Sequence, residues 1–344
     1  MRAVLTVGPG QMRVVDDWPE PAPDPGEVVV QMTALGICGS DLAVWSGHRP
    51  PPELPWIVGH EAIGTVVSLA PDVTGHALGD RVVIEPNYPC GRCSSCLAGR
   101  TSTCPARAIV GINSPGLLRE RAAVPAAFAW PAPIGVADED LVCAEPVAVA
   151  QTAVSTSRLG AGDRCLVLGA GAQGLFVCQL ARAIGGEVAV IEPQPARLEL
   201  ARALGARPAD EQDQYPFVFE TSGTGAGVRT ALQRVEPGGT VVLIGIPHQD
   251  VPVPIATVVR NQVRVIGSLI YDHPQGFART LELLAQGDLA PSRVLGARFE
   301  IESGPEALAA AATLAGKAWI SFASAAVGSY SSVSSRPREL DDRP

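Results

Sequence analysis

The segment Asp163-Arg-Cys-Leu-Val-Leu168 runs directly into Gly169-Ala-Gly171-Ala-Gln173-Gly174, and this stretch decides the fold. The apolar run predicts a buried strand, and a helix and a second strand ending at Ile191 follow it. Three glycines at this spacing let a pyrophosphate approach a tight backbone turn at a helix N-terminus. Glu192 follows the second strand, where an acidic side chain can accept hydrogen bonds from ribose hydroxyls. The stretch therefore predicts a dinucleotide-binding unit.

The strand and helix patterns continue to alternate up to about residue 287. Repeated units of this kind predict a doubly wound parallel sheet, whose ligand binds beyond the C-terminal ends of the strands. Ser222, Gly245 and Ser268 lie at such ends, and we expect them to border the nicotinamide half of the cofactor. Because Glu192 would repel a 2′-phosphate, the sequence favours NAD over NADP. Arg197 is placed to stack on adenine or to serve a phosphate, or it is a solvated charge on its helix.

The rest of the chain predicts a second, mostly β domain. Short strand patterns between residues 3 and 84 are separated by Pro-rich links, since proline cannot donate to a central strand ladder. Short strands resume near residue 289 and predict a return to this domain. The predicted fold is therefore α/β, with a mostly β domain formed by 1–146 and 288–323 and a dinucleotide-binding domain formed by 147–287. The Ser-rich tail, 324–344, has no periodicity and predicts disorder.

Three groups of residues in the mostly β domain suggest an open metal site. Cys38-Gly-Ser40-Asp41 supplies a thiol, His60-Glu61 supplies an imidazole and a carboxylate, and Glu145 follows Cys143-Ala. Each alone is more often a buried small residue or turn chemistry. Together they are the ligand types that hold a catalytic zinc with one position left open. Ser40 is near enough in sequence to relay a proton, and its plainer role is a Ser-Asp turn that caps a helix.

A second metal site is predicted by Cys90-Gly-Arg-Cys93-Ser-Ser-Cys96, followed by Cys104. Two-residue gaps let neighbouring thiolates turn toward one centre, and the fourth cysteine closes a tetrahedron with no open position. Such a site is structural. The alternatives are a reduced cysteine cluster and a redox pair.

Composition excludes several functions. The net charge of −9 provides no basic face for a nucleic acid, so a small molecule is the expected partner. The N-terminal apolar run is too short for the core of a signal peptide, and we expect a cytoplasmic protein. The most lipid-like stretch, 307–328, is interrupted by Gly316 and Lys317, so we expect no membrane association.

The sequence Gly36-Ile-Cys38-Gly-Ser40-Asp41, followed by Gly59-His60-Glu61-Ala-Ile-Gly64, resembles the zinc-dependent medium-chain alcohol and polyol dehydrogenases. The four-cysteine run is similar to the structural-zinc lobe of that family, which spans 88–105 here. The Glu145-Pro146-Val-Ala context resembles the polyol, threonine and cyclitol branch. The resemblance covers the chain to about Phe322 and implies a GroES-like domain around a Rossmann domain, as well as a homo-oligomer, a dimer or a tetramer.

The same resemblance implies two zinc ions, NAD and reversible oxidation of a secondary alcohol. Zinc would lower the pKa of the alcohol, hydride would pass to the nicotinamide, and the proton would leave through Ser40. The zinc ligands are either Cys38, His60 and Glu145 or Cys38, His60 and Glu61, and the sequence leaves both sets open.

A sugar, a cyclitol or another polyol is the expected substrate. Ile270 stands where sorbitol dehydrogenases place an arginine, which counts against sorbitol itself. The alternatives are a short diol, a 3-hydroxy amino acid, a zinc lyase or epimerase, and a non-catalytic NAD(H)-binding relative.

Overall fold

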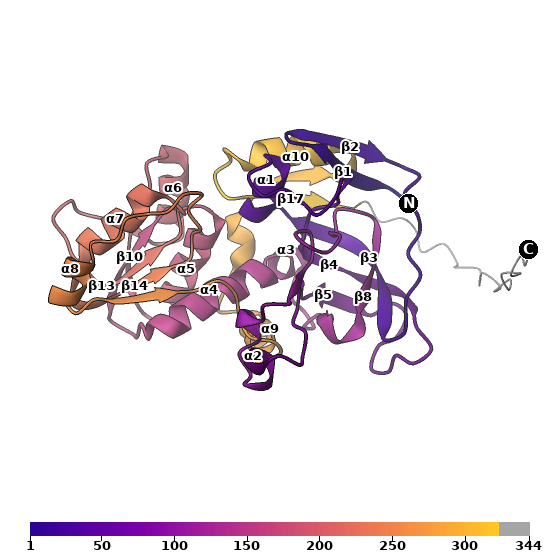
Figure 1. Ribbon diagram of the computed structural model, residues 1–344, viewed down its shortest axis with the longest axis horizontal. Coiled ribbons are helices and arrows are strands. Elements are labelled where there is room, and N and C mark those ends of the chain that lie inside the picture. Colours follow the sequence, from indigo (N-terminus) through magenta and orange to yellow (C-terminus); the bar gives the residue numbers. More distant parts are fainter. Residues whose placement is uncertain (323–344) are drawn as a thin grey trace, which may run out of the picture.

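A computed structural model describes residues 1–322 of the chain, so the tail predicted to be disordered lies outside the described residues. The described chain folds into a mostly β domain and a Rossmann domain that lie side by side (Figure 1). This arrangement confirms the predicted α/β fold class. The residue limits given above for the two domains remain a prediction.

The mostly β domain is built on a seven-stranded sheet in the order β16-β17-β3-β4-β5-β9, and β8 also pairs with β3. The strands β3, β4 and β5 are rich in β-branched residues, which pack well on a pleated surface. The bounds are β3 (Glu27–Gly36), β4 (Glu61–Leu69), β5 (Arg81–Ile84), β8 (Arg121–Pro125), β9 (Ala129–Pro131), β16 (Leu295–Glu300) and β17 (Lys317–Ser321). The C-terminal strands β16 and β17 therefore complete the sheet that the N-terminal part begins.

The register of this sheet positions the predicted metal site. The last residue of β3, Gly36, pairs with Glu61 on one side and with Trp319 of β17 on the other. A Cβ atom at Gly36 would lie 2.4 Å from Glu61 Oε2 and 2.6 Å from Lys317 Cε, so only glycine fits there. Cys38 follows two residues later, beside the start of β4.

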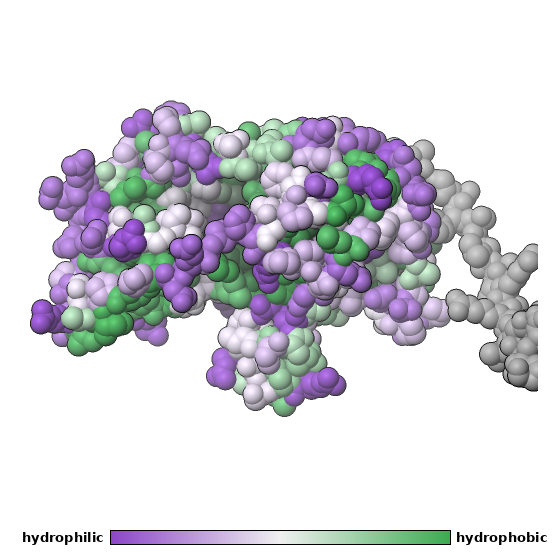
Figure 2. Space-filling model, turned by 45° about the horizontal axis from the view of Figure 1, so that its top comes forward, coloured by the Kyte–Doolittle hydropathy of each residue, from purple (hydrophilic) through white to green (hydrophobic). Residues whose placement is uncertain are grey.

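Smaller elements complete this domain. They are β1 (Ala3–Gly8), β2 (Gln11–Val15), α1 (Gly39–Trp45), β6 (Asn87–Tyr88), α2 (Ser94–Leu97), η1 (Thr101–Thr103), β7 (Ala108–Ile109), η2 (Ala126–Phe128), α3 (Asp138–Leu141), η3 (Pro291–Val294), η4 (Ile301–Ser303) and α10 (Gly304–Ala311). The cysteine-rich loop that carries α2 projects from the body of the molecule (Figures 1 and 2).

The Rossmann domain contains a six-stranded parallel sheet in the order β12-β11-β10-β13-β14-β15. Its strands are β10 (Arg164–Leu168), β11 (Glu187–Ile191), β12 (Arg207–Pro208), β13 (Tyr215–Glu220), β14 (Val235–Leu243) and β15 (Arg264–Gly267). Its helices are α5 (Ala172–Ala183), α6 (Pro195–Ala203), α7 (Gly225–Arg234), α8 (Ile255–Arg260) and α9 (Gln275–Gln286). The strand order reverses between β10 and β13, where a doubly wound sheet binds its ligand.

The sequence predicts a helix over 149–157. In the structure this helix, α4 (Ala144–Ser157), joins the two domains and begins five residues earlier. Pro146 lies in its first turn, where proline is tolerated because its missing N–H has no partner to lose. The early start places Glu145 in that first turn. Residues of α4 and α9 share one apolar cluster with Ala34 and Ile63 of the mostly β domain, so a continuous core joins the two domains.

The sequence also predicts a strand over 264–270, a turn at 236–239 and a helix over 305–315. In the structure the strand ends at Gly267, the segment 236–239 lies within β14, and the helix ends at Ala311. These segments are glycine-rich or alanine-rich, and neighbouring strands rather than local propensity decide their conformation. In the described residues, no helix is long and apolar enough to cross a membrane.

Candidate active site

Three of the predicted ligands of the catalytic zinc lie together. Donor atoms of Cys38, His60 and Glu61 lie within 4.8 Å of one another. Cys38 is the N-cap residue of α1, and His60 directly precedes β4, so the two ends of neighbouring strands bring the ligands into one place. A thiolate, an imidazole and a carboxylate match the donor set of an open zinc site. The Oε1 atom of Glu61 is buried and has no hydrogen-bond partner among the described residues, which fits a ligand of a cation.

Asp41 organises this group of ligands. Its carboxylate is fully buried, accepts hydrogen bonds from the backbone N–H groups of Cys38 (2.8 Å) and Gly59 (2.9 Å), and lies 3.2 Å from His60 Nδ1. Burial would raise the pKa of Asp41, but the charge of His60 and these hydrogen bonds lower it. The carboxylate on Nδ1 orients the imidazole, as second-shell groups of metal sites do. Asp41 is thus the residue that fixes His60.

Ser40 lies beside the same imidazole, with its Oγ atom 3.4 Å from His60 Nε2. It belongs to the first turn of α1, whose cap is Cys38 with Asp41, so Ser40 is not the capping residue. Its hydroxyl is half-buried and therefore reaches both the ligands and solvent. This position suits a proton relay, which remains a prediction.

Lys317 forms an ion pair with Glu61, and its Nζ donates a hydrogen bond of 2.9 Å to the carbonyl oxygen of Ile37. Burial would lower the pKa of Lys317, but the Glu61 carboxylate raises it, so the side chain is an ammonium. In the sequence, Lys317 stands out only as an interruption of an apolar stretch. One signal could have identified it: the printed sequence contains no other lysine among its 26 basic Lys and Arg residues.

Glu145 is near this group of ligands but is not a member of it. Burial raises the pKa of Glu145 to about 7. The charge of His60 lowers this pKa, and the charge of Glu61 raises it. Of the two ligand sets left open by the sequence, the structure brings together Cys38, His60 and Glu61. The role of Glu145 as a direct ligand remains a prediction.

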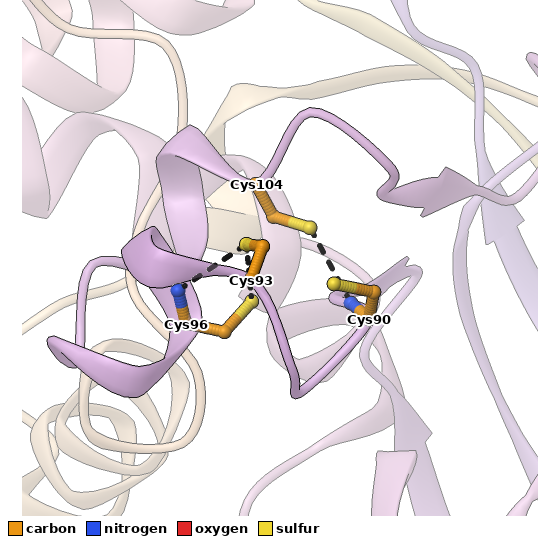
Figure 3. Close-up of side chains that lie close together, drawn as sticks. All are labelled: Cys90, Cys93, Cys96 and Cys104. Atoms are coloured by element: carbon orange, nitrogen blue, oxygen red, sulfur yellow. Dashed lines mark hydrogen bonds between the residues drawn. The ribbon is translucent and has the colours of Figure 1, made fainter.

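The four cysteines of the second predicted site also lie together, and all come from the projecting loop (Figure 3). Their sulfur atoms lie within 4.8 Å of one another. The backbone N–H groups of Arg92 and Cys93 donate to the Cys90 sulfur and lower the pKa of its thiol to about 6, which favours the thiolate that a metal requires. The Cys96 backbone N–H donates to the Cys93 sulfur over 3.5 Å. Four thiols without an open position fit a structural zinc.

The glycine loop after β10 has the shape that a dinucleotide needs. Gly169 has φ +92°, which favours glycine, and a Cβ at Gly174 would lie 2.0 Å from the Gly169 carbonyl oxygen. A Cβ at Gly171, by contrast, would have no neighbour within 4 Å, so the N-terminus of α5 faces open space. Gln173 donates to the Pro146 carbonyl oxygen over 3.3 Å and ties this loop to α4. The loop therefore fits a pyrophosphate at the helix N-terminus.

Glu192 lies at the end of β11, next to this loop. Its carboxylate accepts hydrogen bonds from the backbone N–H groups of Ala170 (2.7 Å) and Gln194 (2.8 Å). Arg197 donates to the carbonyl oxygens of Leu314 (3.1 Å) and Ala312 (3.3 Å), so its guanidinium joins the two domains instead of being a freely solvated charge. Contact of either residue with the cofactor remains a prediction.

Ser222, Gly245 and Ser268 follow the C-terminal ends of β13, β14 and β15, so they lie at the same end of the parallel sheet. A buried residue that sequence analysis did not single out, Glu220, accepts hydrogen bonds from the backbone N–H groups of Ser222 (2.9 Å) and Gly223 (3.3 Å). The Ser268 hydroxyl is buried without a partner among the described residues. An unpaired buried hydroxyl at this edge fits a polar ligand such as the nicotinamide amide.

Comparison with known proteins agrees with this geometry. Residues 24–134 match the alcohol dehydrogenase GroES-like domain, and residues 172–286 match the zinc-binding dehydrogenase family. The 2-dehydro-3-deoxy-L-galactonate 5-dehydrogenase of Pseudoalteromonas atlantica is 32% identical over 287 residues, which cover 78% of this chain and 84% of that protein. The L-threonine 3-dehydrogenase of Streptomyces coelicolor is 32% identical over 320 residues, which cover 86% and 92%.

A solved structure of a short chain alcohol dehydrogenase from E. coli, complexed with NADH, has a TM-score of 0.88 with this chain. The two are 25% identical, and the match covers 94% of this chain and 99% of the other. Both zinc-type domains, both thiol-containing ligand groups and the dinucleotide loop are thus present in one polypeptide. The chain belongs to the zinc-dependent medium-chain dehydrogenases of the alcohol dehydrogenase superfamily, in their polyol branch, and is an oxidoreductase that uses zinc and a nicotinamide cofactor.

Proposed function

We propose that this enzyme uses NAD to oxidise a secondary alcohol of a sugar, a cyclitol or another polyol to the ketone, and that it also catalyses the reverse reaction. The observation that carries the proposal is the close approach of Cys38, His60 and Glu61, within 4.8 Å of one another, in a fold that also has the dinucleotide loop. An open metal site beside a nicotinamide site is the arrangement that hydride transfer from an alcohol needs.

In this proposal, Cys38, His60 and Glu61 hold the catalytic zinc and Glu145 lies beside it. When bound, the zinc supplies a Lewis acid that lowers the pKa of the substrate hydroxyl. Ser40 accepts the proton of that hydroxyl and passes it toward solvent. Asp41 keeps the His60 imidazole in a fixed orientation, supported by the 3.2 Å contact with Nδ1.

We also propose NAD rather than NADP as the cofactor. The Glu192 carboxylate accepts a hydrogen bond from the backbone N–H of Ala170 in the glycine loop. A 2′-phosphate placed there would meet this negative charge, whereas ribose hydroxyls can donate to it. Gly169, Gly171, Gln173 and Gly174 would surround the pyrophosphate, and Ser222, Gly245 and Ser268 would border the nicotinamide.

The name of the Pseudoalteromonas relative supports a polyhydroxy substrate, because that protein is called a dehydrogenase of a deoxygalactonate. The threonine dehydrogenase relative supports a second candidate, a 3-hydroxy amino acid, since its match covers a larger share of the chain. Both substrates carry a secondary alcohol next to further polar groups, so the proposed zinc chemistry is the same.

The test combines metal analysis with a substrate panel. We expect two zinc ions per chain in the wild type and one in Cys38→Ala, because the two ligand groups are separate. We expect NADH formation with at least one sugar, polyol or cyclitol, and its loss in Cys38→Ala; the panel also includes diols, sugar acids and L-threonine. One zinc in both proteins with no NADH from any alcohol would overturn the proposal and favour a non-catalytic NAD(H)-binding protein.

We further propose that the enzyme is a cytoplasmic homo-oligomer. β15 is an edge strand of the Rossmann sheet. Exposed apolar residues lie on this strand (Val265), just after it (Leu269) and on α8 (Ile255 and Val259). An apolar patch covers the end of the molecule where Figure 1 places α8 (Figure 2). An open, apolar edge can pair with the same strand of a second copy, which buries both. Free thiols as metal ligands suit a reducing compartment.

A further inference from the structure

The segment that connects β15 to α9 carries three consecutive residues with unusual interdomain contacts, Tyr271, Asp272 and His273. Each of them is hydrogen-bonded to the mostly β domain. Tyr271 is fully buried although it is a large polar-tipped side chain. A loop held on three successive side chains is positioned more firmly than surface loops usually are.

Two of these residues bind the loop that holds the structural zinc. The Asp272 carboxylate accepts a hydrogen bond of 2.7 Å from the backbone N–H of Ser102. The His273 N–H donates to the Thr101 hydroxyl over 2.6 Å, and that hydroxyl lies 3.4 Å from the His273 carbonyl oxygen. Thr101 and Ser102 belong to η1, whose C-cap residue is the zinc ligand Cys104. A metal that fixes Cys104 therefore also fixes the turn that holds Asp272 and His273.

The His273 imidazole is held from the opposite side. Its Nδ1 lies 2.8 Å from Glu85 Oε2, the same oxygen that accepts a hydrogen bond of 2.7 Å from Trp130 Nε1. The ring also stacks on Phe128 with a centroid distance of 4.4 Å. His273 is thus clamped between the zinc loop and the sheet of the mostly β domain.

Tyr271 extends from this clamp toward the proposed active site. Its hydroxyl accepts a hydrogen bond of 3.2 Å from Asn87 Nδ2, and its ring belongs to the same core cluster as Ala144 and Ala148 of α4. Burial raises the pKa of Tyr271, and the neighbouring charge of Glu145 raises it further. The phenol therefore stays neutral, and its ring packs in the same cluster as the α4 residues Ala144 and Ala148, between which Glu145 lies in the sequence.

We propose that Asp272 is a positioning residue through which the structural-zinc loop sets the location of Tyr271 against α4, the helix that carries Glu145, and with it the affinity for the alcohol substrate. The inference rests on the proposed function, since Glu145 is taken there as part of the active site. The structural zinc then has a role in substrate binding in addition to the stability of its own loop.

The kinetic test compares Asp272→Ala, Asp272→Asn and the control Asp288→Ala, an exposed residue just after α9. We expect Asp272→Ala to raise the KM for the alcohol about tenfold, the effect of losing a charge-assisted hydrogen bond. The KM for NAD and the zinc content should not change. Asp272→Asn should stay within about twofold, because its amide oxygen still accepts from Ser102.

A double-mutant cycle separates positioning from general destabilisation. In a Tyr271→Phe background, Asp272→Ala should change the KM for the alcohol by less than about twofold, because the group it positions is gone. Additive effects of the two substitutions, loss of zinc, or an equal rise in the KM for NAD would overturn the proposal.

A second measurement does not require turnover. Hydrogen exchange of the peptide 268–277 should be faster in zinc-loaded Asp272→Ala than in the wild type and in Asp288→Ala. Unchanged exchange there would overturn the inference even if the enzyme is active. If the wild type oxidises no alcohol, the proposed function fails, and the exchange experiment still decides whether the zinc loop positions this segment.

Discussion

The ammonium group of Lys317 and the carboxylate of Glu61 form a buried ion pair beside the ligand group of Cys38 and His60, and the two residues are 3% and 0% exposed. Lys317 is the first residue of β17, and Glu61 is the first residue of β4, directly after His60. Every other basic side chain among the 26 lysines and arginines is an arginine. The compact ammonium fits beside Gly36, where a Cβ atom would already lie 2.6 Å from Lys317 Cε.

Lys317→Met should destabilise the protein by about 3 kcal/mol, because it leaves the Glu61 carboxylate buried without its cation. The loss should be smaller at saturating zinc, since a metal ion provides another cation for Glu61. Thermal unfolding with and without added zinc measures both effects. The exposed control Arg13→Met should change little, and the double variant Glu61→Gln/Lys317→Met should recover most of the loss. A Lys317→Met protein as stable as the wild type would contradict this account.

Cys104→Ser should remove one zinc ion and leave the catalytic ligand group intact. A structural metal contributes its binding free energy to folding, so we expect the midpoint of thermal unfolding to fall by about 5 °C or more. Metal analysis and thermal unfolding check the two parts. Cys165→Ser changes a buried cysteine outside both ligand groups and should keep both metals. Full zinc content in Cys104→Ser would show that this cysteine is not a ligand.

Glu192→Ala should shift the cofactor preference toward NADP. Removing the carboxylate removes both the acceptor for ribose hydroxyls and the repulsion of a 2′-phosphate, so the NADP-to-NAD ratio of kcat/KM should rise about tenfold or more. Glu187→Ala, an exposed residue at the opposite end of β11, is the matched control. An unchanged ratio would mean that Glu192 does not face the adenosine ribose.

Ser40→Ala should lower kcat about a hundredfold, the usual contribution of a positioned proton-transfer group, without loss of zinc. Ser40→Thr keeps the hydroxyl and should retain more activity. Ser46→Ala is the control at the opposite end of the same helix, where the hydroxyl contacts His48 over 2.6 Å instead of His60. Steady-state rates and metal content are the measurements, and equal rates for Ser40→Ala and wild type would exclude the relay.

Val265→Lys should lower the solution mass of the protein, because a charge on an exposed edge strand opposes pairing with a second copy. Light scattering coupled to size-exclusion chromatography measures the mass. Leu97→Lys, an exposed apolar residue on α2, should leave the mass unchanged. A wild-type protein that is monomeric at all concentrations would contradict the oligomer.

Features carried by one short stretch of chain could be predicted from the sequence. The glycine loop at Gly169, the acidic residue Glu192 and the four-cysteine run each depend on spacing along the backbone. The sequence predicts a strand over 187–191 and a helix over 275–286, and both have these bounds in the structure, since their apolar pattern is strong. Boundaries failed where glycine or proline gave a misleading local signal, as at Pro146 and residues 236–239.

The sequence by itself determined which chemistry this chain contains: two thiol-containing metal-binding groups and a dinucleotide loop, because ligand type and short-range spacing set these properties. Tertiary structure decided which of those groups meet. Glu61 rather than Glu145 lies with Cys38 and His60, and Lys317 reaches the site from the far end of the chain. Contacts between residues hundreds of positions apart depend on strand order and register, and no local pattern records them.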